Sequence, residues 1–174
     1  IGTVTVAVDS IPVGRITIKL EIKPAGRAPS AKMDALDAVT TEARRYEQAF
    51  ISYASPDRNK VIARVQMLHV QGINFFLDLL SLDPGDRWKK KMYRHIDDCD
   101  LFLLFWSSHA KASSWVMKEV GYAIQRKAGD DDSPPDIHPI IIEVPPPVPP
   151  PPELAHLHFN DRLIYFMDRD PPPV

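Results

Sequence analysis

The chain has 174 residues, of which 44 % are apolar and 25 % are charged, and its formal net charge at pH 7 is −2. This composition is typical of a globular protein, and the balanced charge argues against a nucleic-acid-binding protein or a polybasic membrane-surface protein. The longest apolar run, residues 101–106, is too short to span a bilayer. The single cysteine, Cys99, excludes an intrachain disulfide, so we expect a protein of the reducing cytoplasm.

The first 48 residues are predicted to be an appendage. Residues 3–8 and 15–22 alternate apolar and polar side chains, which predicts a β-hairpin. Two strands alone are marginally stable, so we expect the segment 1–31, hairpin and linker, to be part of an upstream module. A narrow apolar stripe predicts a connecting helix over residues 32–48. Because the chain begins with Ile1 instead of Met, we expect it to be a piece of a longer protein.

From residue 49 onwards, short apolar runs alternate with helical patterns. Ser55 as N-cap, Pro56 at the first helical position and Asp57 in the first turn predict a helix start after the first strand. The alternation predicts an α/β domain with a parallel sheet, and right-handed crossovers favour a flavodoxin-like strand order with helices on both faces. Five strands are predicted, at residues 49–53, 73–77, 100–106, 137–144 and 163–166.

A candidate site follows the third of these strands. Ser113 or Ser114 can cap a helix, which places Trp115 and Glu119 at positions i and i+4 on one helix face. Ligands of open α/β sheets bind near the carboxyl ends of the strands. A carboxylate beside a flat ring at that place suits a sugar that carries an aromatic base. On spacing alone, the alternative is a half-buried Trp beside a solvated Glu on an amphipathic helix.

Four motifs, in order and spacing, resemble the signature of TIR (Toll/interleukin-1 receptor) domains. The resemblance covers residues 49–168, leaves residues 169–174 as a disordered tail, and implies a five-stranded parallel sheet. The motifs are Phe50-Ile-Ser-Tyr-Ala-Ser55 with Asp57, Leu82-Asp-Pro-Gly85 with Trp88, Cys99-Asp100 leading into Phe102-Leu-Leu-Phe-Trp-Ser107, and Ser114-Trp-Val-Met-Lys-Glu119.

The resemblance divides the functional hypotheses into two. In one branch of the family, a glutamate placed after an aromatic residue cleaves NAD⁺ at the nicotinamide–ribose bond, and Trp115 and Glu119 match that pattern. This branch implies Glu119 as the catalytic residue, NAD⁺ as substrate and no cofactor. The product would be ADP-ribose or a cyclic isomer, in bacterial defence signalling. The alternative is a non-catalytic scaffold that acts only through protein–protein contacts.

Further residues are assigned around this site. Trp115 and Trp88 are predicted to form flat walls, and Tyr53 and Ser55 to lie at the end of the first strand where a nucleotide would rest. Arg58 or Lys89 is predicted to meet the pyrophosphate. By the resemblance, self-association with other TIR domains involves the BB loop, Asp83, Pro84, Gly85 and Asp86, and an upstream sensor or oligomerising module triggers activity.

Other features favour structural interpretations. The basic run 89–95 is interpreted as a solvated helix face, with phosphate or DNA steering as the alternative. His156 and His158 lack further ligands, so no metal site is expected. Cys99 is predicted to be a buried thiol. The Pro-rich segment 143–153 is predicted to be an extended polyproline spacer across the sheet, with an SH3-type ligand as the alternative.

Overall fold

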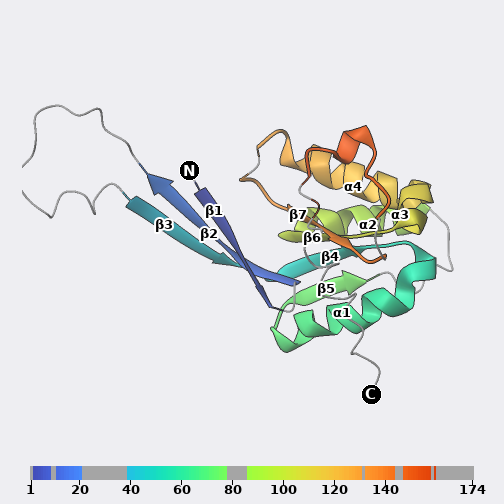
Figure 1. Cartoon of the computed structure of the whole chain (residues 1–174), viewed down its shortest axis with the longest axis horizontal. Coiled ribbons are helices and arrows are strands. Elements are labelled where there is room, and N and C mark those ends of the chain that lie inside the picture. Colours follow the sequence, from blue (N-terminus) through green and yellow to red (C-terminus); the bar gives the residue numbers. More distant parts are fainter. Residues whose placement is uncertain are drawn as a thin grey trace, which may run out of the picture. The chain divides into compact units, whose positions relative to one another are not determined.

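The computed structural model describes residues 2–8, 11–20, 39–77, 86–130, 132–143, 147–157 and 159. The chain forms two compact units, Ile1–Tyr46 and Glu47–Val174, which are described separately (Figure 1). Within the described residues, no helix is long and apolar enough to cross a membrane.

The first unit is a three-stranded antiparallel sheet in the order β1-β2-β3. The predicted hairpin is present, with a register shift between Val6 and Ala7. The connecting helix predicted over 32–48 is wrong for residues 39–45, which form a strand paired with β2. Its apolar stripe was narrow, and the β-branched start Val39-Thr-Thr41 fits a pleated sheet better than a helix. The strands are β1 (Gly2–Val8), β2 (Ile11–Leu20) and β3 (Val39–Arg45).

The second unit contains the predicted parallel sheet. Its four described strands run in the order β5-β4-β6-β7, which is the flavodoxin-like arrangement with the first strand inside the sheet. The predicted fifth strand, 163–166, and the predicted tail, 169–174, lie outside the described residues. The strands are β4 (Gln48–Ser52), β5 (Asn74–Leu77), β6 (Leu101–Trp106) and β7 (Asp136–Ile141).

Helices cover both faces of this sheet, with α1 on one side and α2 and α4 on the other (Figure 1). The helices are η1 (Ser55–Asp57), α1 (Arg58–Val70), α2 (Asp86–Asp98), α3 (Ser108–Ala112), α4 (Ser114–Lys127) and η2 (Pro152–Leu154). The short helix α3 was not predicted. The predicted N-cap role of Ser55 is also wrong: Ala54 takes that position, and Ser55 is the exposed first residue of a 3₁₀ turn. A 3₁₀ turn at this point tightens the entry into α1, so the chain reaches the helix one turn later than the Ser-Pro-Asp pattern indicated.

The second unit buries side chains on both faces of its sheet. Helix α1 contributes Val61, Val65 and Leu68 on one face, and a core cluster lies between the sheet and helices α2 and α4 on the other. All six side chains of β6 are fully buried, as expected of a strand covered on both faces. Alternate strand residues, Phe50, Phe102, Leu104 and Trp106, share one cluster with residues of α2 and α4. This packing fixes the carboxyl ends of β4, β6 and β7 side by side, and the polar side chains discussed next gather there.

Candidate functional site

A buried hydrogen bond joins the last residue of β4 to helix α4. Ser52 Oγ donates to Glu119 Oε2 over 2.6 Å, and Glu119 is only 4 % exposed. This distance is in the range of hydroxyl bonds to an ionised carboxylate. The solvated-Glu alternative is therefore wrong, because Glu119 faces the sheet.

The local sequence explains why Glu119 is turned inward. Ser113 caps α4, accepting a hydrogen bond from the backbone N–H of Val116 at 3.3 Å. Val116, Val120 and Ala123 are fully buried, and Glu119 lies on the same helical face. Trp115 is partly buried and packs against the core cluster, so its ring is held at the margin of the hydrophobic core.

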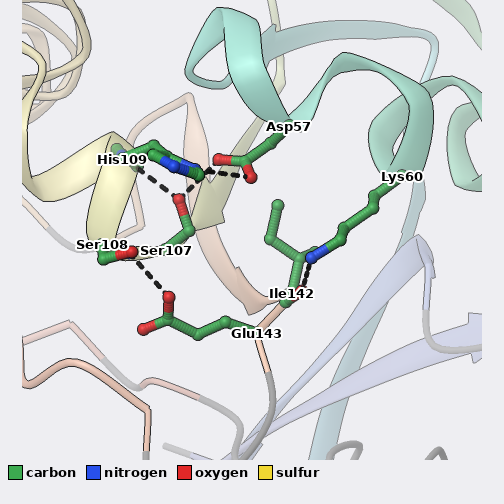
Figure 2. Close-up of polar contacts among 8 residues, drawn as sticks. Asp57, Lys60, Ser107, Ser108, His109, Ile142 and Glu143 are labelled. Atoms are coloured by element: carbon green, nitrogen blue, oxygen red, sulfur yellow. Dashed lines mark hydrogen bonds and ion pairs between the residues drawn. The ribbon is translucent and has the colours of Figure 1, made fainter.

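A second polar cluster lies at the same edge of the sheet, between the loops that follow β4 and β6 (Figure 2). Asp57, 3 % exposed, accepts a hydrogen bond of 2.5 Å from Ser107 Oγ at its Oδ2 atom. Its Oδ1 atom lies 3.1 Å from Nδ1 of His109, whose side chain is 56 % exposed. With an ionised carboxylate, which can only accept, Nδ1 of His109 is the donor in this contact. The buried carboxylate thus joins two loops and orients an exposed imidazole.

Glu143, two residues after the end of β7, lies beside this cluster and contacts Ser108 (Figure 2). Its carboxylate accepts hydrogen bonds from the backbone N–H groups of Ser108, at 2.8 Å, and Val148, at 2.7 Å. Partial burial disfavours the charged form, but these donors outweigh it and lower the pKa of Glu143 below its usual value. Lys60 Nζ donates weakly, over 3.4 Å, to the carbonyl of Ile142. These contacts connect α1, α3 and the Pro-rich segment to the residues that follow the carboxyl end of β7.

The structure places the other predicted site residues as follows. Tyr53 is half-buried directly after Ser52, and Ser55 is exposed on η1. Arg58 begins α1, and its buried Nε atom has no hydrogen-bond partner within the described part of the chain. Trp88 and Lys89 lie in the first turns of α2. Of the BB-loop residues, Asp86 is the first residue of that helix, whereas 83–85 lie outside the described residues.

Several residues of this edge were missed from the sequence. Ser52 could have been found from strand alternation, because it shares the face of Phe50 that α4 covers. Ser107, His109 and Glu143 follow apolar strands, which is a general signal for this edge, but nothing in their spacing indicates that they meet Asp57 or each other.

The interpretation of Cys99 as a buried thiol is confirmed. Desolvation by burial is the main cause that raises its pKa to about 12, although Arg126 opposes the shift. Across the described residues there is no cluster of three or more metal-ligating side chains. His156 is exposed, and His158 lies outside the described residues.

Comparisons with known proteins agree with this architecture. A family model described as "TIR domain" matches residues 49–169. Among solved structures, the TIR domain of the Toll-related receptor TRR-2 from Hydra magnipapillata is similar, with 21 % sequence identity and a TM-score of 0.52. That match covers 64 % of this chain and 80 % of the Hydra chain, and at this identity it supports the fold alone. No curated protein matches the sequence. The family match spans more than half of the chain, and the chain therefore belongs to the TIR domain family.

Proposed function

We propose that this TIR domain is an NAD⁺ glycohydrolase that cleaves the nicotinamide–ribose bond when it is self-associated, as an effector in bacterial defence signalling. The observation that supports this most is the position of Glu119, at the carboxyl ends of the parallel strands and one helical turn after Trp115. Ligands of open α/β sheets bind at this edge. The burial of Glu119 and its hydrogen bond to Ser52 count against the enzyme and favour the scaffold discussed below.

A single carboxylate can be sufficient for this reaction. Nicotinamide leaves the ribose as a neutral group, so no general acid is needed, and positive charge develops on the ribosyl carbon as in glycoside hydrolysis. A carboxylate in a site of low dielectric stabilises that charge and can accept hydrogen bonds from the ribose hydroxyls. In this proposal Glu119 has that role. The ribosyl carbon then bonds to a water oxygen, which releases a proton to solvent and gives ADP-ribose, or to a nucleophilic atom elsewhere in the same ADP-ribosyl group, which gives a cyclic isomer.

The remaining contacts to NAD⁺ come from neighbouring elements. Trp115 lies one helical turn before Glu119 and, with Trp88, provides flat walls for the base and ribose. Tyr53 and Ser55 follow the end of β4, where the nucleotide would rest. The buried Nε–H of Arg58 lacks an acceptor among the described residues, which supports a contact to pyrophosphate, and Lys89 is the second candidate.

Self-association is part of this proposal because Glu119 is only 4 % exposed. A substrate can reach a buried carboxylate only if the surrounding segments rearrange, and contact with a second domain can supply the free energy for that change. TIR domains generally interact with other TIR domains. Residues 83–86 are the segment we assign to that contact, and an upstream module would trigger it.

The same burial favours a second function, a non-catalytic scaffold. A carboxylate that is hydrogen-bonded and nearly inaccessible can serve only to fix α4 against β4. In that case the domain acts in signalling through its surface alone.

Release of nicotinamide from NAD⁺ by a concentrated or forced-oligomer sample separates the two functions. We expect turnover by the wild-type chain and its loss in Glu119→Ala and Glu119→Gln. Glu153→Ala is the matched control, because it removes an exposed glutamate from η2. Turnover that survives in Glu119→Ala would exclude Glu119 as the catalyst. A wild-type chain that is inactive in every assembled state would identify the scaffold.

A further inference from the structure

We propose that Ser52 is a positioning residue for this cleavage, and that its hydroxyl orients the Glu119 carboxylate and holds it in the ionised form. The inference rests on the proposed function. It adds a second residue to the reaction, one that acts on Glu119 and does not touch the substrate.

The position of Ser52 makes its hydroxyl a fixed donor. It is the last residue of β4, an interior strand that pairs with β5 on one side and β6 on the other, and it lies in register with Leu104. Its side chain is completely buried. Because the strand fixes the backbone and packing surrounds the side chain, the donor cannot follow the carboxylate if α4 shifts. It therefore defines where Glu119 Oε2 lies.

Electrostatics give the Ser52 hydroxyl the same role. Burial disfavours a charged carboxylate, and a hydroxyl that donates to it offsets part of that penalty. Only the ionised carboxylate stabilises positive charge on the ribosyl carbon. The hydroxyl of Ser52 therefore favours the form of Glu119 that the reaction needs.

A similar arrangement recurs at the same sheet edge. Ser107, directly after β6, donates to the buried carboxylate of Asp57. In both pairs, a serine at the end of a strand fixes an acid from another element. The two pairs differ in what lies beyond the acid, because Asp57 orients His109, whereas Glu119 lies one helical turn from Trp115.

The test compares steady-state kinetics and pH profiles of Ser52→Ala, Ser52→Cys and Ser52→Thr in the forced-oligomer sample. We expect Ser52→Ala to lower kcat about 10- to 100-fold with little change in KM, as for loss of a hydrogen bond to a charged group. The acid limb of its profile should move to higher pH, because the ionised carboxylate loses a donor. A purely structural role would leave the pH profile unchanged.

Two further variants separate hydrogen bonding from packing. Ser52→Cys keeps the shape but is a weak donor, so it should resemble Ser52→Ala and provides the test if the alanine variant fails to fold. Ser52→Thr retains the hydroxyl and should recover part of kcat and the wild-type acid limb. Ser133→Ala is the matched control. It removes another 2.6 Å serine–carboxylate bond, to Asp130, before the start of β7 at the opposite end of the strands.

The outcomes distinguish this inference from the function on which it rests. Wild-type turnover that disappears in Glu119→Ala but persists with an unchanged pH profile in Ser52→Ala and Ser52→Cys would overturn the inference alone. Absence of wild-type turnover in every assembled state would overturn both. A lower kcat and a displaced acid limb in Ser52→Ala, with kcat partly recovered and the acid limb restored in Ser52→Thr, would support the inference and the proposed function.

Discussion

His95 on α2 lies flat against Phe76 on β5, with 3.8 Å between ring centroids and 16° between ring planes. Desolvation by burial, followed by repulsion from Lys91, lowers the pKa of this imidazole, and Asp98 opposes the shift. The folded state therefore binds the proton less readily than the unfolded state. Stability that is present above the ordinary histidine pKa should fall as the pH drops from 7 to 5.

His95→Phe tests this effect, because it keeps the ring stacking and removes the titration. We expect the free energy of unfolding of the wild-type chain, relative to this variant, to decrease between pH 7 and pH 5 in urea denaturation. An NMR titration should give His95 a pKa below its ordinary value. A difference between the two chains that is constant over this pH range would contradict the assignment.

Trp115 offers a second test at the scale of a residue. Its ring is partly buried against the core cluster, so Trp115→Ala should lower the free energy of unfolding by about 2 kcal/mol, roughly half of the cost of a fully buried aromatic residue. If the ring also forms a wall for NAD⁺, Trp115→Ala should reduce nicotinamide release by more than this loss of folded protein explains. Circular dichroism and turnover, measured on the same sample, check both. An unchanged turnover per folded chain would limit Trp115 to packing.

The sequence could predict that Glu119 shares a helix face with Trp115, because the i, i+4 spacing lies within one helix. Its partner Ser52 is 67 residues away, and that contact depends on how β4 and α4 pack. The same limit applies to Asp57 and His109, which are 52 residues apart. Helical periodicity orients a side chain relative to its own helix, but a partner from another strand is fixed only by tertiary packing.

At the scale of elements, strong periodicity gave correct predictions and weak periodicity did not. The continuous apolar run at 101–106 became the fully buried β6, and the clear alternation that begins at residue 15 became part of β2. The narrow stripe over 32–48 misled because pairing with β2 decided the structure of residues 39–45. Local preference is a weak signal where a neighbouring strand offers a full ladder of hydrogen bonds.

The Pro-rich segment shows how an element without internal hydrogen bonds is held in place. Proline has no N–H, so Val148 has the only backbone donor between Pro145 and Pro152, and it donates to Glu143. The carbonyl of Val148 accepts from Trp106 Nε1 at 2.8 Å, and the carbonyl of Pro149 accepts from Lys111 Nζ at 2.9 Å. Residues 147–151 have no helix or strand, as the spacer interpretation requires. The prediction is wrong for residues 152 and 153, which belong to the 3₁₀ helix η2, and residues 144–146 lie outside the described residues.

This arrangement predicts unequal effects for the two donors. Trp106→Phe leaves a partly buried carbonyl unpaired and opens space in the core, so it should destabilise the chain by about 2–4 kcal/mol. Lys111→Met removes an exposed bond and should change stability by less than about 0.5 kcal/mol. Urea denaturation of both variants measures the difference. Equal effects would show that the indole N–H and ring do not anchor the segment.

At the scale of the whole molecule, each unit has its own sheet, and the two sheets do not share a strand. The edge strand β1 exposes Val4 and Val6, at 52 % and 41 %, and contains no charged residue, whereas β3 at the opposite edge contains Glu42, Arg44 and Arg45. Natural sheets commonly protect their edges with charge. An uncharged edge leaves β1 able to pair with a further strand, and the assignment of residues 1–31 to an upstream module stays a prediction.

The last prediction concerns the independence of the second unit. Within the described part of the chain, its core cluster and strand ladders come from residues after Glu47, so a chain of residues 47–174 should fold by itself. We expect one cooperative unfolding transition in urea, with a midpoint close to that of the same transition in the full chain. Non-cooperative unfolding or strong binding of a hydrophobic dye would show that the first unit completes the core.

If residues 47–174 fold, joining them to an oligomerising partner should restore nicotinamide release without residues 1–46. The oligomerising partner already brings the TIR domains together, so the first unit would no longer be needed for assembly. Turnover that still requires residues 1–46 would therefore show that these residues contribute to the active site itself.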